Sequence, residues 1–359
     1  MKKRKDNKIT KKPDRDANLD LIRATAILLV LAYHIISMWP VENSLIRKIS
    51  SFGRHGVDLF FVLSGFLVGG LYFRELRTLG RVHNVSFWLR RALRTIPPYF
   101  VALLLVYSSV RFVRGDAFDL SYLWFGQNYR LEMPYFWASW SLCVEEHAYI
   151  FMVLVLGLLV ATKISLGVSL LLICFSAALM PLFDSAIRGL IGWDPRKNAT
   201  HLWYGGIAFG ILASWIQVYR ASLWGSIQRA SRFIWPIPLT FACYLSWAGG
   251  SWLPWLPFTM AFACTVLLAA CAGMAPLPGS TTRIVRAIAI SSYSAYLVHG
   301  LIIHIGKYLK SKFPLVPDLI MAGVWIGIII LSTGVFYFCV ERTSIHMRDR
   351  LIPRPNKTV

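Results

Sequence analysis

The sequence is short of charged residues, and of acidic residues above all. Of its 359 residues only 15% are charged, whereas 56% are hydrophobic, and the mean hydropathy is +0.55. Soluble domains carry about 25% charged and about 45–50% apolar residues. This shortage of charge excludes a soluble globular enzyme and favours a chain that lies mostly inside a membrane.

Cysteine is also scarce and lacks the spacing of a metal or redox site. The six cysteines all lie inside apolar stretches, with no C-x-x-C pair and no histidine at ligand spacing. We therefore expect packing roles for them, with neither disulfides nor a bound metal.

Acidic residues number 17 against 38 Lys and Arg, which leaves a net charge of +21. In a soluble protein such an excess is typical of nucleic-acid binding. In a membrane chain the basic residues mark the cytoplasmic side instead. We expect no nucleic-acid partner, and we expect anionic membrane lipids to attract the basic N-terminal tail.

Long apolar stretches are what the sequence does contain. About 17–25 such residues cross a hydrocarbon core of about 30 Å. We expect about ten transmembrane helices in an all-α polytopic membrane protein. They cover 21–41, 56–73, 97–113, 139–161, 164–183, 201–219, 233–248, 254–273, 287–305 and 319–340. The segment 121–140 is rich in aromatic and small polar residues and is either re-entrant or a further short span.

The distribution of basic residues predicts the orientation of these spans in the membrane. With the N-terminus inside, 25 of the 38 Lys and Arg residues fall on the cytoplasmic side and 12 outside, and Arg23 lies in the first span. Cytoplasmic loops of membrane proteins carry such an excess. We expect both termini in the cytoplasm, with basic tails at 1–19 and 342–359 flanking a membrane domain at 20–341.

Ionisable residues inside the apolar stretches are the candidates for function, because a charge at membrane depth is costly. Arg23 and His34 are 11 residues apart, about 20° beyond three helical turns, so they share one helix face about 16.5 Å apart along the axis. This suits an anionic donor held at the rim by arginine, with its reactive end at a histidine base. The alternative is that Arg23 is a topology anchor and His34 a core histidine that serves packing.

Further charged residues flank the second and third spans. Asp58 opens the second span, either to orient a histidine or as a carboxylate favoured by the helix dipole. Arg91 and Arg94 are i, i+3 neighbours, a spacing that suits bidentate contacts with phosphates. For Arg90 we prefer the role of a topology anchor.

Two further groups lie near the ends of later spans. Glu145 and Glu146 stand at the start of an apolar run, where Ser141, Glu145 and Tyr149 share one face at i, i+4 spacing. In the ninth span, Tyr296 and His299 lie on one face and are either part of a substrate pathway or an interfacial pair.

Six motifs occur in a fixed order: Arg-x10-His, GVDLFFVLSGFL, RRALRTIPPYF, SWSLCVEEHAY, YSAYLVH and FYFCVERT. Together they resemble the acyltransferase-3 family of integral membrane acyltransferases, from about residue 20 to residue 350. The resemblance implies an essential Arg and His at Arg23 and His34, and the family's R-x-x-R pair at Arg91 and Arg94. It also favours Glu145 as a site residue. The chain departs from the family at two positions outside the proposed chemistry, Ala148 and Thr343.

For Glu146 the resemblance likewise favours a place in the site. The family acylates glycans and related small molecules, usually with acetyl-CoA or another acyl-CoA as donor. We therefore expect an O-acyltransferase, in particular an O-acetyltransferase, of a bacterial-type inner membrane. His34 would be the general base, the three arginines would hold the phosphates of coenzyme A, and Asp58 or Glu145 would orient the base or the acceptor.

Two rival functions use the same sequence differently. A transporter or flippase of a lipid-linked glycan would use the same Arg, His and Glu residues as a substrate or proton path, and it predicts inverted repeats that the sequence does not show. A non-catalytic membrane scaffold would need none of the intramembrane charges.

Overall fold

The computed structural model describes residues 16–37, 44–130, 133, 135–191, 198–249, 255–275, 278–313 and 317–353, and these form helices joined by short turns. Of the two expected basic tails, residues 1–15 and 354–359 lie outside the described residues. The long helices are α1 (Ala17–Ile36), α3 (Gly56–Leu79), α4 (Asn84–Arg114), α5 (Trp140–Ala161), α6 (Leu166–Ile191), α12 (Gly279–Lys312) and α13 (Asp318–Phe336). The shorter α-helices are α2 (Ser44–Ser51), α7 (Thr200–Trp203), α8 (Gly205–Tyr219), α9 (Ala221–Ile234), α10 (Pro236–Gly249), α11 (Leu256–Ala272) and α14 (Arg342–Leu351).

Several single turns join these helices. They are η1 (Phe52–His55), η2 (Leu120–Leu123), η3 (Gln127–Tyr129) and η4 (Trp137–Ser139), with a π-helical turn η6 (Tyr337–Glu341) between α13 and α14. The described residues of 121–140 thus form 3₁₀ turns before α5 begins, and not a further span. Burial raises the pKa of the Tyr135 phenol in this segment, so it stays protonated while its oxygen accepts the Asp119 amide at 2.7 Å.

The ends of the helices follow from local chemistry. Asp16 caps α1, because its carboxylate accepts hydrogen bonds from the backbone amides of Asn18 and Leu19. Gly80 and Gly115 end α3 and α4 with φ angles of +68° and +76°. Glycine adopts this left-handed conformation without the steric cost that a side chain brings.

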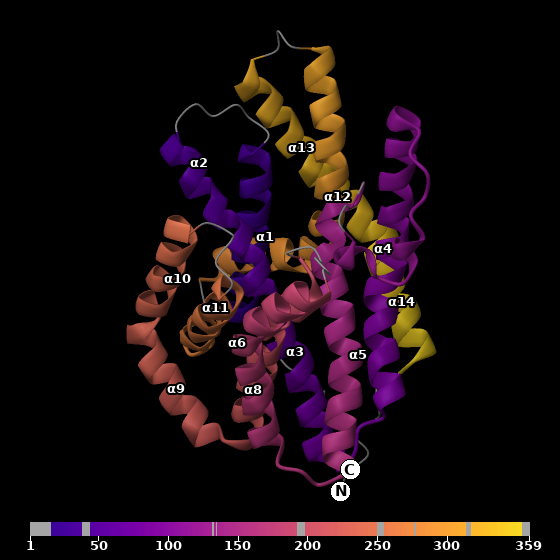
Figure 1. Ribbon diagram of the computed structural model, residues 1–359. Helices are drawn as coiled ribbons and strands as arrows, with labels where there is room; N and C mark the ends of the chain where they lie inside the picture. The colour runs from indigo at the N-terminus through magenta and orange to yellow at the C-terminus, as the bar shows by residue number, and fades with distance from the viewer. Residues whose placement is uncertain are drawn as a thin grey trace, which may run out of the picture.

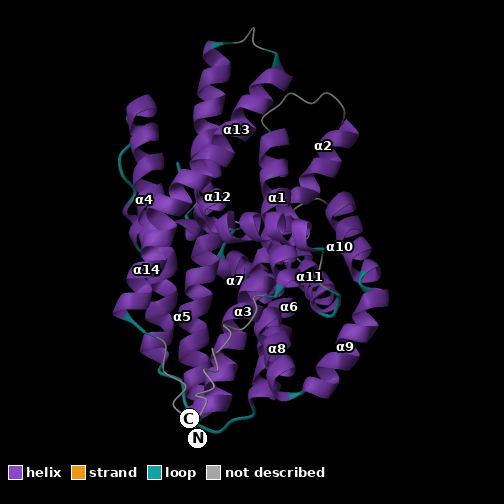
Figure 2. Cartoon of the chain, turned by 180° about the vertical axis from the view of Figure 1, so that it is seen from behind, coloured by secondary structure: helices purple, strands orange, loops and turns teal. Residues whose placement is uncertain are grey.

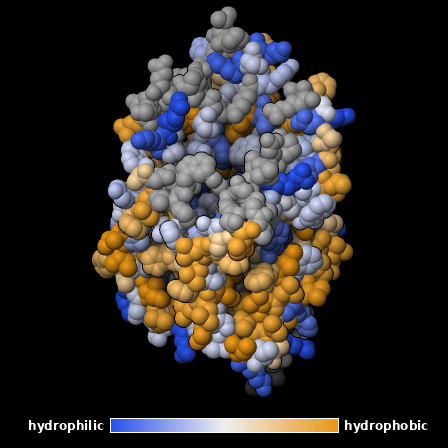
Figure 3. All heavy atoms as spheres, viewed as in Figure 1, coloured by the Kyte–Doolittle hydropathy of each residue, from blue (hydrophilic) through white to orange (hydrophobic). Residues whose placement is uncertain are grey.

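The helices are arranged around α1 and α3, which run through the centre in both ribbon views (Figures 1 and 2). Helices α9, α10 and α11 stand on one side of this centre, and α4, α5 and α14 stand on the other. Figure 3, seen from the same side as Figure 1, shows hydrophobic residues in a broad belt across the lower half of the molecule. Exposed leucine and phenylalanine side chains such as Leu154, Leu171 and Phe175 are each more than half exposed. Such a surface suits lipid contact.

Seven helical segments among the described residues are long and apolar enough to cross a membrane. They are Ala17–Ile36, Leu45–Leu79, Asn84–Phe112, Trp137–Ala161, Leu166–Ile187, Gly279–Lys312 and Ile320–Leu351. The expectation of a polytopic all-α protein agrees with this finding, but the count of ten is not confirmed. The orientation of the termini stays a prediction.

The difference in the count arises between residues 201 and 273, where we expected three spans. There α8, α10 and α11 have 15, 14 and 17 residues. At 1.5 Å per residue such helices measure about 21–26 Å, which is shorter than a hydrocarbon core of about 30 Å. Apolar composition did not predict the helix ends: the expected span 201–219 is divided between α7 and α8, and α10 and α11 are shorter than the expected spans 233–248 and 254–273.

Glycines allow α3 and α8 to approach closely. A Cβ atom added at Gly65 would meet the backbone carbonyl oxygen of Ile207, and one added at Gly210 would meet that of Val62. We expect Gly65→Leu to destabilise the protein by about 1–3 kcal/mol or more, because backbone atoms cannot move aside as a side chain can. Thermal unfolding of detergent-purified protein measures this.

The matched control is Gly323→Leu, since nothing lies within 4 Å of a Cβ atom added at Gly323 on α13. Equal unfolding temperatures for the two variants would show that the contact between α3 and α8 does not need glycine.

Candidate active site

A cavity of about 80 Å³ lies among five helices, and three of the predicted arginines line it. Arg23 comes from α1, and Arg91 and Arg94 come from α4. Glu145 of α5 and Tyr296 of α12 line the same cavity. The structure therefore brings together five predicted site residues that are far apart in the sequence.

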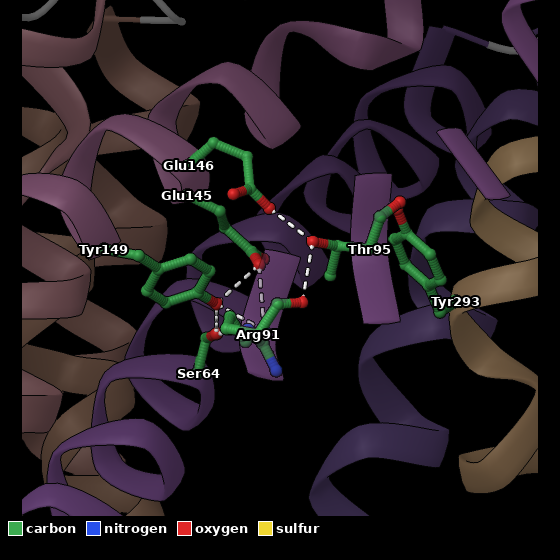
Figure 4. Close-up of polar contacts among 7 residues, drawn as sticks. All are labelled: Ser64, Arg91, Thr95, Glu145, Glu146, Tyr149 and Tyr293. Atoms are coloured by element: carbon green, nitrogen blue, oxygen red, sulfur yellow. Dashed lines mark hydrogen bonds and ion pairs between the residues drawn. The ribbon is translucent and has the colours of Figure 1, made fainter. Parts of the chain in front are cut away.

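Hydrogen bonds hold Arg91 in place on the cavity wall. Its Nη2 donates to the Tyr149 hydroxyl at 2.5 Å and to Oε2 of Glu145 at 3.4 Å, and its guanidinium lies over the Tyr149 ring at 4.5 Å (Figure 4). The Tyr149 hydroxyl donates to Glu145 at 2.7 Å, and Ser64 of α3 hydrogen-bonds to Tyr149. The i, i+4 pairing of Glu145 with Tyr149 is confirmed.

Arg94 differs from Arg91, because its guanidinium makes no hydrogen bond to protein atoms within the described part of the chain. It lines the cavity and interacts electrostatically with the carboxylate of Glu341. A guanidinium has five N–H donors, and protein interiors rarely leave such donors without a partner. Arg94 is thus a guanidinium with its donors available to an anion in the cavity.

Glu341 supplies a counter-charge that we did not assign from the sequence. It is wholly buried in the π-helical turn η6, accepts the Ser294 hydroxyl at 2.6 Å, and interacts electrostatically with Arg94 and Arg23. Its Oε1 has no hydrogen-bond partner among the described residues. Its position at the end of an apolar run could have identified Glu341 as a site residue in the sequence, because charges inside a membrane are frequent at functional sites. The π-helical turn is a second sign, since such turns are also frequent there.

Glu146 has a different hydrogen-bond partner from its neighbour Glu145. Its carboxylate accepts the Thr95 hydroxyl at 2.6 Å, and it does not line the cavity (Figure 4). Tyr293 donates to the backbone carbonyl of Thr95 at 2.7 Å. Glu146 therefore supports the part of α4 that carries Arg91, and the structure places it behind the cavity wall.

His34 lies beside the cavity and not among the residues that line it. Its Nδ1 is 2.9 Å from the Val30 carbonyl, so Nδ1 carries the hydrogen and Nε2 presents a lone pair. Its ring centroid is 4.6 Å from Trp137 and 5.0 Å from His299. Tyr296 lines the cavity, and its ring centroid is 5.3 Å from that of His299. The rings of Tyr296 and His299 therefore connect the cavity with His34.

His299 is wholly buried beside His34, one turn after Tyr296 on the same helix. Its Nδ1 is 2.6 Å from the Tyr296 carbonyl, and its Nε2 has no hydrogen-bond partner among the described residues. The Tyr296 hydroxyl is held by Ser141 at 2.6 Å and by the Ala138 carbonyl at 2.8 Å. The His34 and His299 rings thus stand side by side.

Asp58 orients a histidine, but that histidine is His55 and not His34. Its Oδ2 lies 2.9 Å from Nδ1 of His55, one turn earlier in the chain, and Asp58 does not line the cavity. The structure therefore separates Asp58 from the group of residues around Arg23. The i, i+3 spacing of His55 and Asp58 is the local signal that could have shown this pairing.

Comparison with known proteins places the chain in a family. The model of the family Acyl_transf_3, described as an acyltransferase domain, matches residues 16–341. The relative "Putative O-acetyltransferase SACOL0978" of Staphylococcus aureus (strain COL) is 30% identical over 161 residues, covering 40% of this chain and 25% of the relative. No solved structure matches the chain.

Two further relatives are similar over comparable lengths. "Putative peptidoglycan O-acetyltransferase YrhL" of Bacillus subtilis is 30% identical over 219 residues, which are 52% of this chain and 30% of the relative. "Peptidoglycan O-acetyltransferase OatA" of Listeria monocytogenes is 30% identical over 152 residues, which are 37% of this chain and 23% of the relative. The matched part of this chain spans about a quarter of the length of these curated relatives. The family match does not favour a transporter or flippase, and the chain belongs to the acyltransferase-3 family.

Proposed function

We propose that this chain is a membrane-bound O-acyltransferase, in particular an O-acetyltransferase, that moves an acyl group from cytoplasmic acyl-CoA to a hydroxyl of a glycan or glycosylated small molecule. Its place would be the inner membrane of a bacterium. The observation that carries the proposal is one cavity lined by three arginines, of which Arg94 has no hydrogen bond to protein within the described residues.

The arginines suit the phosphates of coenzyme A. Guanidinium groups bind phosphate oxygens through paired, charge-assisted hydrogen bonds. Arg91 is held in position by Glu145 and Tyr149, whereas Arg94 and Arg23 share the buried charge of Glu341. In this proposal a phosphate accepts the hydrogen bonds of the Arg94 guanidinium. Arg91 and Arg23 complete the anion site.

His34 suits the role of general base. The Val30 carbonyl keeps the hydrogen on Nδ1, so Nε2 can take a proton. In a direct transfer, Nε2 takes the proton of the acceptor hydroxyl while its oxygen attacks the thioester carbonyl. The new C–O bond forms, the C–S bond breaks, and the departing thiolate takes the proton from the imidazolium. His299 stands next to this base, with an unpartnered Nε2 that can share the proton.

The acceptor class rests on the relatives. All three are named as O-acetyltransferases, and two of the names specify peptidoglycan. A glycan hydroxyl is therefore the first acceptor to test. Membrane lipids would surround the enzyme.

The proposal is tested with detergent-purified protein, radiolabelled acetyl-CoA and a panel of hydroxyl acceptors that includes peptidoglycan fragments. We expect label to appear on an acceptor in a form that mild alkali releases, as it does from an ester. Binding of coenzyme A is measured in parallel on the same preparation. A well-folded protein that neither binds coenzyme A nor acylates any acceptor would contradict the proposal.

A further inference from the structure

A serine, a histidine and an aspartate form a chain of hydrogen bonds outside the arginine-lined cavity. Oδ2 of Asp58 on α3 lies 2.9 Å from Nδ1 of His55 in η1, and Nε2 of His55 lies 3.0 Å from Oγ of Ser246 on α10. Ser246 is 6% exposed and Asp58 is 3% exposed. Two consecutive elements, η1 and α3, and the remote helix α10 thus supply one buried polar line.

The protonation pattern of this line follows from its partners. A carboxylate can only accept, so Nδ1 of His55 carries the hydrogen and donates it to Asp58. Nε2 then has the lone pair, and the Ser246 hydroxyl can donate to it. This is the arrangement in which an imidazole takes the proton of a serine nucleophile while a carboxylate holds its tautomer.

Arg54 adds a positive charge at the serine oxygen. Its Nη2 donates to Oγ of Ser246 at 2.8 Å, and its Nε makes a longer contact of 3.5 Å with Nε2 of His55. A guanidinium in this place would stabilise negative charge that develops on an oxygen next to the nucleophile. If these residues served only to tie α10 to η1, the hydrogen bond between Ser246 and His55 would be enough. The Asp58 carboxylate and the Arg54 guanidinium would then not be needed.

Neighbouring rings hold the two segments together. Phe52 of η1 stacks on Trp247 of α10 with ring centroids 6.1 Å apart, and Lys48 of α2 lies over the same indole at 4.9 Å. Packing of this kind fixes Ser246 against His55, so the geometry does not depend on a bound substrate.

We propose that Ser246, His55 and Asp58 form a second catalytic site, a serine nucleophile for small acyl esters. Oγ of Ser246 attacks the ester carbonyl and forms a new C–O bond, while its proton moves to Nε2 of His55. The bond to the alcohol oxygen breaks, and that oxygen takes the proton from His55. Water or a second hydroxyl then removes the acyl group from Ser246 by the same steps. This chemistry needs no acyl-CoA and is independent of the proposed transferase function.

The test uses a fluorophosphonate on the purified full chain, followed by peptide mass spectrometry. Oγ of Ser246 would form a bond to phosphorus, fluoride would leave, and the serine proton would move to His55. We expect the adduct on Ser246 in the wild-type protein and none in Ser246→Ala. We expect His55→Gln to slow labelling by about 10²-fold or more, which is the usual contribution of a general base.

Two measurements complete the experiment. His346→Gln, on the exposed face of α14, is the matched control and is expected to label as the wild type does. Thermal unfolding confirms that each variant is folded, and release of nitrophenol from a small nitrophenyl ester follows turnover. A folded wild-type protein without an adduct on Ser246, or labelling that is equally fast in folded His55→Gln, would overturn the proposal and reduce the three residues to a structural tie.

Discussion

Replacing His34 by glutamine is expected to lower kcat for acyl transfer by about 10²–10⁴-fold, the contribution of a positioned general base. Glutamine can occupy the space beside Trp137 and His299, but it cannot take the proton of a hydroxyl. Because His34 does not line the arginine cavity, the Kd for acetyl-CoA should stay unchanged. Radiolabel transfer and equilibrium binding, measured on the same purified protein, separate the two quantities.

The matched control for this variant is His346→Gln. His346 also directs Nδ1 at a backbone carbonyl four residues earlier, that of Arg342, but it lies exposed on α14. It should keep full activity. Transfer by folded His34→Gln at the wild-type rate would contradict the assignment of the base and leave donor binding untouched.

Arg94→Gln is expected to weaken binding of acetyl-CoA by about 10–100-fold, because hydrogen bonds to charged groups contribute about 1.5–3 kcal/mol. Because Arg94 is also a counter-charge of the buried Glu341, the same change should lower the unfolding temperature, and binding is measured at a temperature at which the variant is folded. Calorimetry with coenzyme A and thermal unfolding measure the two effects.

Arg90 offers the control on the same helix. Its guanidinium hydrogen-bonds to Asp349 at 3.1 Å and to the Ile352 carbonyl, and it does not line the cavity. Arg90→Gln should therefore bind coenzyme A as the wild type does. Equal losses of binding in both variants would show that Arg94 acts through net positive charge and not as a direct ligand.

Much of the site follows from the cost of placing a charge in a membrane. Arg23, Arg91, Arg94 and Glu145 stand out in the sequence because apolar residues surround them, and the structure gathers all four on one cavity. The i, i+4 spacing of Glu145 and Tyr149 also survives in the fold, because neighbours within one helix keep their geometry wherever the helix packs.

Residues whose partners come from another helix were beyond the sequence. Glu341 joins Arg94 and Arg23 only because η6 packs against α4 and α1 carries Arg23 to the same cavity. Ser246 carried no signal of its own, since a lone serine in an apolar stretch is ordinary.

The sequence by itself determined the class of the protein, its helical secondary structure and the family motifs, because hydropathy and spacing along one helix are local properties. The tertiary structure decided which spans are long enough to cross, which arginine makes no hydrogen bond to the described part of the protein and which arginines lie near Glu341. These depend on the packing of helices far apart in the chain, as at Gly65 and Gly210, where the approach of α3 to α8 is set by backbone contact. The shortage of charge marked where function lies, and packing decided what each charge touches.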